Sequence, residues 1–220
     1  MREWQVGDPI GDGNDIGVPD VKYMDYLKNN SYDAPIMNNN VKQSDIKKSK
    51  MYRDEAWKLN QEEKFYDALT FINAAINHNP NDDENWNIKA LILWHIFETN
   101  DEDVALEVYH CFNKALGLNP YAKIIKKNKA EFLTQWALKL FNSKSDIKQA
   151  TKRVNEALSI FEDKTSYAYP FALYLKSSIL YINKEYDEAL KYVNKALEIL
   201  PNDEFMQKTK QDILSKRLPD

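Results

Sequence analysis

The sequence YDEALKYVNKALEILP, residues 186–201, decides the fold, because the tetrapeptide NKAL inside it returns along the chain. Further copies of the pattern Asn-x-Ala-(Leu/Ile) begin at Asn73, Asn113 and Asn155, ahead of the copy that begins at Asn194. Their alanines lie 40, 42 and 39 residues apart. A pattern that returns at this interval is typical of a chain that stacks one supersecondary unit on the next. The sequence therefore predicts a helical repeat array.

Helix-capping and helix-breaking residues punctuate the chain after Ser44, where an apolar period of 3.6 residues is almost continuous. Proline stands at Pro80, Pro120 and Pro201, next to expected helix starts, where its missing N–H costs little. Only five glycines occur, four of them near the start of the chain, which suits long helices joined by short turns. The predicted helices cover residues 44–62, 65–78, 82–98, 101–117, 120–142, 146–162, 167–183, 186–200 and 203–216.

The alanine of each tetrapeptide has a packing role. Two packed helices whose axes approach within about 8–10 Å leave room for alanine at their crossing and not for leucine. We therefore expect Ala75, Ala115, Ala157 and Ala196 to be buried at helix contacts. The asparagine two positions earlier lies on a different face of the helix. Its recurrence is explained either by solvent exposure or by a bond to a neighbouring helix.

Composition bounds the class of protein. The formal net charge of the 220 residues is −4, and residues 1–33 carry all of it, so the remainder presents no basic field that argues for nucleic acid. The single cysteine, Cys111, excludes an internal disulfide, and no secretory signal opens the chain. The longest apolar stretch, residues 90–97, is far shorter than the roughly 20 residues of a membrane span. We expect a cytoplasmic protein with no membrane partner.

Residues 1–43 differ from all that follows. They are rich in Gly, Pro, Asp and Asn and show no sustained helical period, although a short helix over 21–28 is an alternative. The sequence thus predicts two parts, an irregular acidic arm over 1–43 and a helical repeat domain over 44–220. The arm also contains Trp4, Tyr23, Tyr26 and Tyr32, which are unusual in such a segment and raise the hypothesis that it docks.

Two stretches carry a family resemblance. FYDAL at 65–69 is followed by Ala75 and Pro80, and YDEAL at 186–190 is followed by Ala196 and Pro201. Both resemble tetratricopeptide repeats, in which a small residue near the start of the second helix is followed seven positions later by alanine and five later by proline. Ala56 and Ser177 take the family's small-residue position on the first helices of these two repeats. The weaker second and third copies contain Trp86, Ala90, Ala115 and Pro120, and Ala130, Ala150 and Ala157, respectively.

The two middle copies depart from the family pattern. The second has about six extra residues between its helices, and the third has about eight and lacks the closing proline, so HEAT-like or generic α-solenoid repeats remain an alternative. The resemblance covers about residues 49–201, and residues 202–217 would form the polar cap that such arrays require. It implies an all-α fold, a right-handed α–α superhelix of about four helix pairs with a C-terminal capping helix.

The resemblance also implies a binding site, because these arrays commonly hold a peptide or helix in a concave groove lined by their first helices. Trp and Tyr beside Arg and Lys there are typical of interface hot spots, although Leu91, Trp94 and Tyr181 would serve equally as core. Arg53 and Trp57 stand where the family's clamp for acidic C-terminal tails has Lys and Asn, which argues against chaperone-tail binding. The matching positions are Lys50, Arg53, Trp57, Asn60, Asn87, Leu91, Trp94, Lys127, Glu131, Thr134, Tyr174, Ser178 and Tyr181.

Other candidate sites do not reach the pattern that their chemistry needs. The glycine-rich stretch 7–15 lacks the Gly-Lys-Ser/Thr of a phosphate loop, and a calcium loop from Asp12 would place Ile16 and Tyr23 at ligand positions. Only His95 and Glu98 have helical metal-site spacing, and His110 and Cys111 point to different helical faces. The basic residues around 123–129 and 148–153 are expected to form solvated surfaces. We expect no metal, cofactor or catalytic residue.

The sequence therefore favours a non-enzymatic adaptor that binds a segment of another protein. Two alternatives stay open: an enzyme or enzyme subunit that uses the Asp-rich arm, and an RNA-binding helical repeat protein, with nucleic acid the less expected partner. A related hypothesis places the acidic arm in the groove near Arg53 and Lys127, where it would compete with the partner. The identity of the partner and the oligomeric state stay open.

Overall fold

The computed structural model describes residues 41–96, 102–143, 146–162 and 164–217. Within these ranges the chain is helical and contains no strand. The helices are α2 (Gln43–Gln61), α3 (Phe65–His78), α4 (Asp83–Ile96), α5 (Glu102–Leu118), α6 (Lys123–Asn142), α7 (Ile147–Ile160), α8 (Ala168–Ile182), α9 (Tyr186–Ile199) and α10 (Glu204–Arg217). Residues 1–40, nearly all of the predicted acidic arm, lie outside the described residues.

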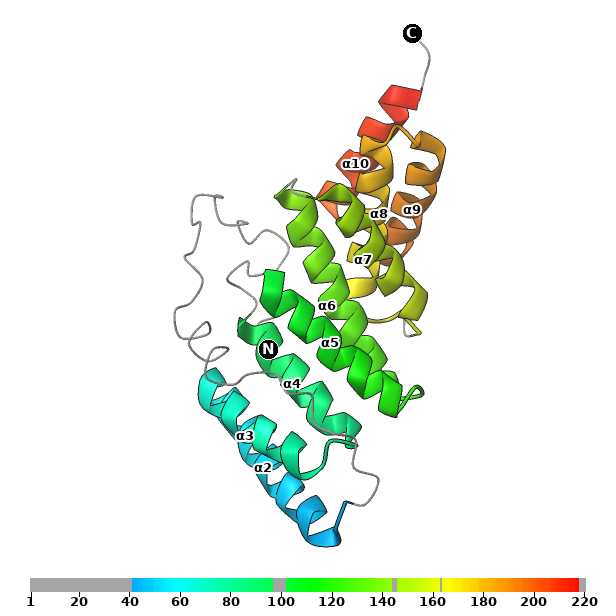
Figure 1. Ribbon diagram of the computed structural model, residues 1–220. Coiled ribbons are helices and arrows are strands. Elements are labelled where there is room, and N and C mark those ends of the chain that lie inside the picture. The colour runs from blue at the N-terminus through cyan, green and yellow to red at the C-terminus, as the bar shows by residue number, and fades with distance from the viewer. Residues whose placement is uncertain (1–40, 97–101, 144–145, 163, 218–220) are drawn as a thin grey trace.

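The helices form four consecutive pairs, α2 with α3, α4 with α5, α6 with α7 and α8 with α9. The first helices of the pairs also contact one another in order, α2 with α4, α4 with α6 and α6 with α8. Figure 1 shows the pairs following one another from α2 at the bottom to α10 at the top. The predicted all-α solenoid of helix pairs is confirmed, with α10 packed on α9 at its C-terminal end.

Most helix boundaries fall within one or two residues of the prediction. The largest difference at a described helix start is in α6, predicted from residue 120 and observed from Lys123. Pro120 and Tyr121 instead form a turn, which the backbone N–H of Ala122 closes by donating to the carbonyl of Asn119 at 3.2 Å. The end predicted for the third helix, residues 97–98, lies outside the described residues.

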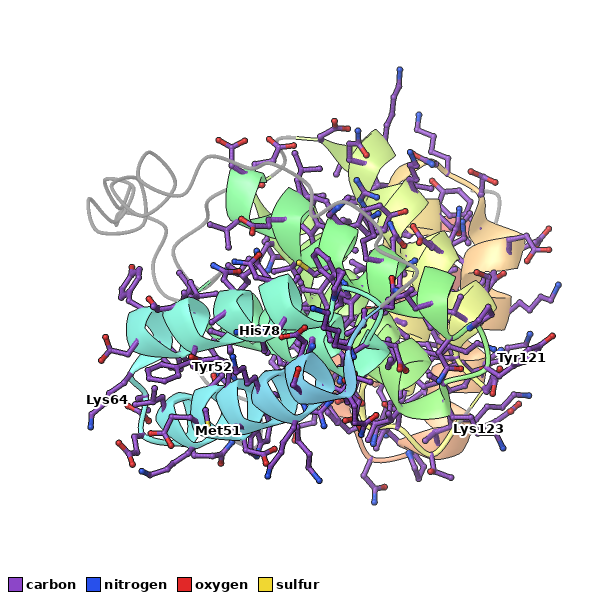
Figure 2. All side chains as sticks on the ribbon, turned by 60° about the horizontal axis from the view of Figure 1, so that its bottom comes forward. Met51, Tyr52, Lys64, His78, Tyr121 and Lys123 are labelled. Carbon is purple, nitrogen blue, oxygen red and sulfur yellow. The ribbon has the colours of Figure 1, made fainter. Side chains whose placement is uncertain are left out.

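The alanines of the repeated tetrapeptide occupy the expected places. Ala75, Ala115, Ala157 and Ala196 are all completely buried, so no side chain larger than a methyl group is accommodated there without displacement. Nearby, the ring of Tyr52 on α2 stacks on that of His78 on α3 with 5.5 Å between centroids, and both side chains can be followed in Figure 2.

Two turns show why the first and fourth pairs match the family pattern best. Glu63 and Lys184 adopt positive φ values of 59° and 65° after the first helix of their pairs. The next residues, Lys64 and Glu185, donate their N–H groups to the carbonyls of Leu59 and Leu180, in each case at 2.9 Å. This is a Schellman motif, which terminates a helix with one left-handed residue. The two repeats therefore share their turn geometry as well as their sequence spacing.

One prediction about charged residues is wrong. Lys129 and Arg153 were expected on solvated faces, but both are buried. The guanidinium of Arg153 lies over the rings of Trp136 and Tyr109, at 4.0 and 4.6 Å from their centroids. Lys129 reaches a Glu156 carboxylate oxygen at 2.6 Å. Because aromatic faces and a carboxylate replace the lost water, these two cations are tolerated inside the third pair.

Candidate partner-binding face

The residues predicted to bind a partner lie on the first helices of the four pairs, α2, α4, α6 and α8. We call the solvent-facing rows of these helices the first-helix face. Residues three, four or seven apart on one helix lie on the same row, which also assigns Ile124 to the row of Lys127 and Glu131, and Ile182 to the row of Ser178. The burial of each side chain decides what this face can offer to a partner.

On α2, Lys50 and Trp57 are exposed, and Trp57 shows 42% of its surface to solvent. Arg53 forms ion pairs, with its Nη1 atom 2.9 Å from Asp82 in the turn before α4 and 2.8 Å from Glu84 on α4. Asn60 is buried. Of the four predicted α2 residues, Lys50 and Trp57 are therefore the two that present a side chain to an incoming segment.

On α4, two of the three predicted residues, Asn87 and Trp94, are bonded to α6. The side chain of Asn87 is buried and accepts a hydrogen bond from Asn128 Nδ2 at 3.2 Å. Trp94 donates its indole N–H to Gln135 and meets the ring of Phe132 edge-on, at 5.8 Å between centroids. Leu91 and Trp94 are half-buried and pack against the core. The interpretation of Leu91 and Trp94 as core residues is thus partly right.

On α6, Lys127 is exposed and lies 3.9 Å from Glu131, one turn further along the helix. Glu131 also accepts a hydrogen bond from the hydroxyl of Ser166 at 2.8 Å. Thr134 is buried and donates its hydroxyl to the carbonyl of Ala130 at 2.9 Å. Lys127 is the most accessible of the three predicted residues on this helix.

On α8, the predicted residues are half-buried. Tyr174 accepts a hydrogen bond from the Thr209 hydroxyl of α10 at 3.4 Å, which ties the capping helix to the face. Ser178 donates its hydroxyl to the carbonyl of Tyr174 at 3.1 Å. The ring of Tyr181 packs near that of Tyr186, at 5.9 Å between centroids. Each of these side chains keeps part of its surface exposed.

Three predicted residues, Asn60, Asn87 and Thr134, are therefore corrected to buried positions. Asn87 is bonded to α6 and Thr134 to its own helix, and the family register alone does not distinguish such buried positions from solvent-facing ones. Sequence reasoning also missed Ile124 and Ile182, which are 68% and 54% exposed. The signal that would have found them is an isoleucine on a predicted surface row, seven residues before Glu131 or four after Ser178.

The remaining reactive groups do not form a second site on the described part of the chain. Burial raises the pKa of Cys111 to about 12, which keeps the thiol protonated at neutral pH. Burial, helped by nearby Lys114, lowers the pKa of the adjacent His110. Among the residues that the structure describes, no group of three His, Cys, Asp or Glu side chains gathers as a metal site would require. No described helix has the length and apolarity needed to cross a membrane.

The comparisons with known proteins agree with this architecture. A model of the tetratricopeptide repeat family matches residues 170–203, which are α8, α9 and the turn that follows. A solved structure of MamA from Desulfovibrio magneticus RS-1, beginning at its residue 41, is 16% identical with a TM-score of 0.51, over 80% of this chain and 93% of that one. A double mutant of MamA RS-1 is 17% identical with a TM-score of 0.52, over 80% of this chain and 94% of that one.

These likenesses concern the fold. No curated protein matches the sequence. The matched repeat covers the fourth helix pair, and the first pair repeats its turns and its buried alanines. The two middle pairs continue the same stacking of first helix on first helix. The fourth helix pair therefore matches a tetratricopeptide repeat, and the array as a whole shares the fold of the two MamA structures.

Proposed function

We propose that this protein is an adaptor that binds a segment of another protein on its first-helix face. The observation that carries the proposal is the exposure of large apolar side chains there, Trp57, Ile124 and Ile182, from three different helix pairs. Such side chains, spaced along one face, are the anchors that a helical or extended segment uses. Lys50 and Lys127 lie beside them and would set register.

The second helices of the pairs offer a natural comparison. Among the described residues, α5 and α9 expose Leu106 and Ile199, at 46% and 40%. The first helices expose Ile46, Met51, Trp57, Ile124 and Ile182. Exposed apolar side chains that gather on one face are typical of an interaction site, whereas single ones scattered over a surface are normal. This imbalance favours the first-helix face over the opposite one.

The half-buried residues contribute shape more than affinity. Four half-buried residues pack against the core and expose only part of their surface: Leu91, Trp94, Tyr174 and Tyr181. We assign to them the base of the binding surface, between the exposed anchors. Most of the free energy of binding would then come from the few exposed anchors. The proposed role is therefore to bind another protein without catalysing a reaction.

Affinity purification with the full chain tests this proposal. The protein is coupled to beads, and partners are identified from cell extract by mass spectrometry. The test variant is Trp57→Ala with Ile182→Ala. Its matched control is Leu106→Ala with Ile199→Ala, which removes apolar surface from the opposite face. We expect the test variant to lose proteins that the control retains, with both variants shown to be folded by circular dichroism.

The same experiment can overturn the proposal. If proteins captured by the unchanged chain remain bound to the Trp57→Ala, Ile182→Ala variant and leave the control, the second helices carry the interface. A partner that remains on both variants would likewise remove the apolar anchors from the mechanism. Binding that is lost steeply with salt, to generic RNA, would favour the RNA-binding alternative.

A further inference from the structure

The start of α6 carries an exposed aromatic and basic patch that overlaps the first-helix face at Ile124 and Lys127 and extends beyond it. Tyr121, in the turn before α6, is 86% exposed, and Ile124, in its first turn, is 68% exposed. Tyr167, just before α8, is 56% exposed. With Lys123 and Lys127 these residues form what we call the α6-edge patch. Figure 2 shows Tyr121 and Lys123 on the same side of the molecule.

The loop between α7 and α8 holds Tyr167 against α6. Its Glu162 carboxylate accepts a hydrogen bond from Lys126 Nζ at 2.5 Å, and its Ser166 hydroxyl donates to Glu131 at 2.8 Å. Burial and the charge of Glu131 raise the pKa of Tyr167, which is consistent with the closeness of the two side chains. Both bonds reach α6 within its first three turns. The patch therefore rests on a fixed surface built from two helix pairs.

The patch carries excess positive charge. Around it Lys123, Lys126, Lys127 and Lys164 stand against Glu131 and Glu162, and the sequence adds Asp163 between Glu162 and Lys164, which leaves an excess of one positive charge. Elsewhere on the first-helix face the strongest cation is already engaged, because Arg53 contacts two carboxylates. An acidic segment with apolar side chains would complement the α6-edge patch better than the α2 end of the array.

The chain itself supplies a segment of that chemistry. Residues 12–33, DGNDIGVPDVKYMDYLKNNSYD, contain five aspartates against two lysines, together with Ile16, Val21, Tyr23, Met24 and Leu27. The rest of the chain, after residue 33, is neutral. The segment thus holds most of the net negative charge and a run of apolar side chains at one end of the molecule.

The segment also has the reach. Because α2, α4 and α6 alternate with oppositely directed partners, all three begin on the same edge of the array, the right-hand one in Figure 1. Two steps between neighbouring first helices amount to about 20 Å at the usual spacing. The seven residues 34–40 span up to about 23 Å when extended, which brings Asp33 from the start of α2 to the start of α6.

We propose that residues 12–33 bind the α6-edge patch of the same chain, with aspartates near Lys123 and Lys127 and apolar side chains on Tyr121, Ile124 and Tyr167. This contact does not require the proposed function, because it forms within one chain. It shares Ile124 and Lys127 with the first-helix face, so a partner bound there would compete with it. It moves the expected docking site of the arm away from Arg53, whose charge is already satisfied.

Paramagnetic broadening in the full chain tests this contact. A nitroxide is attached to a cysteine introduced as Ser31→Cys, because native Cys111 is buried and protonated. The signals observed are the isoleucine δ1 methyl groups. We expect the Ile124 signal to fall severalfold more than that of Ile182, which is similarly exposed on the first-helix face and lies at the C-terminal end of α8. Raised ionic strength should restore it.

Charge reversal supplies the matched control. Lys123→Glu with Lys127→Glu should abolish the selective broadening of Ile124. Lys47→Glu with Lys48→Glu makes the same change on exposed residues of α2, nearer to the arm, and should leave it intact. Equal broadening of Ile124 and Ile182, or broadening that survives the Lys123→Glu, Lys127→Glu change, would overturn the proposal. So would broadening of Ile124 that appears only when a nitroxide-labelled chain is mixed with an isotope-labelled one, since the contact would then join two copies.

Discussion

The hydroxyl of Ser49 and the side-chain amide nitrogen of Asn85 lie 2.8 Å apart inside the protein, although 36 residues separate them in the chain. The Ser49 hydroxyl donates a hydrogen bond to the carbonyl of Ala75 at 2.9 Å, and Asn85 Nδ2 also donates to the carbonyl of Asn79 at 3.1 Å. Both side chains are completely buried. A short chain of polar groups thus joins α2, α3 and α4 across the boundary between the first two helix pairs.

Removing Asn85 should weaken that boundary. We expect Asn85→Ala to lower the free energy of unfolding by about 1–3 kcal/mol, because Ser49 and two backbone carbonyls lose a buried donor. Urea denaturation measures the change. Asn155→Ala, on the exposed side of α7, is the control and should have little effect. Equal stability of the two variants would show that the polar chain contributes nothing measurable.

Enlarging a buried alanine should cost stability, whereas filling open space nearby should not. Ala115→Leu places three extra carbons at a completely buried position of α5 and should destabilise by about 1–3 kcal/mol. Two residues later, Gly117 has no atom within 4 Å of the position that a methyl group would take. Gly117→Ala should therefore stabilise the helix by about 0.5–1 kcal/mol. Thermal unfolding of the two variants, shifting in opposite directions, checks both expectations.

The carboxylate of Glu156 compensates the buried cations of the third pair. It lies 2.6 Å from Lys129, and the single O–H of Tyr109 is shared between its two oxygens, each 3.1 Å away. Glu156→Gln keeps the shape and removes the charge, so Lys129 is left inside without its counterion. We expect a loss of about 2 kcal/mol, below the full cost of breaking a buried pair because Glu156 is partly exposed.

An exposed ion pair provides the comparison for this change. Glu188 and Lys191, one turn apart on α9, lie 3.3 Å from each other at the surface. Glu188→Gln should change the free energy of unfolding by less than about 0.5 kcal/mol. Chemical denaturation of both variants in the same buffer measures the difference. If the two substitutions cost the same, the buried cluster does not depend on the charge of Glu156.

The thiol of Cys111 should be inert in the folded protein. Burial raises its pKa from 9.0 to about 12. Because the folded pKa lies above the unfolded one, the stability linked to the protonated thiol is fully present below pH 9 and is lost as the pH rises toward 12. We expect an aromatic disulfide reagent to label Cys111 far more slowly in buffer than in urea. Cys111→Ala should lose less stability between pH 8 and pH 10.5 than the unchanged chain, and equal losses would contradict the assignment.

The sequence predicted the helices well because their ends depend on local chemistry. The boundaries of α3 agree residue for residue with the prediction, since Pro80 and the Asn79 turn terminate it whatever lies around. At α6 the same rule placed the start of the helix three residues too early, because Pro120 lies in the turn before the helix and not at its first position. The repeat spacing was predictable for a similar reason, because it is the interval between small residues and can be counted in the sequence.

The candidate binding face was less predictable, because it depends on which neighbour each helix row meets. Asn87 and Thr134 fall on family positions that these particular helices turn inward. Arg153 was expected in water because arginine is usually exposed, yet Tyr109 and Trp136, from two other helices, enclose it. No pattern in the sequence near Arg153 predicts that rings from other helices enclose it. Ile124 and Ile182 escaped notice for the opposite reason, since apolar residues at regular spacing predict burial.

The capping helix α10 has a consequence for how the array comes apart. It packs on α9, its Met206 and Ile213 side chains are fully buried, and its Thr209 hydroxyl donates a hydrogen bond to Tyr174 of α8. In a linear stack each layer is secured mainly by the layers beside it, so the terminal layer with the smallest contact detaches first. Among the described helices, amide hydrogen exchange should consequently be fastest in residues 204–217 and become slower toward the middle of the array, as the helices detach from the C-terminal end.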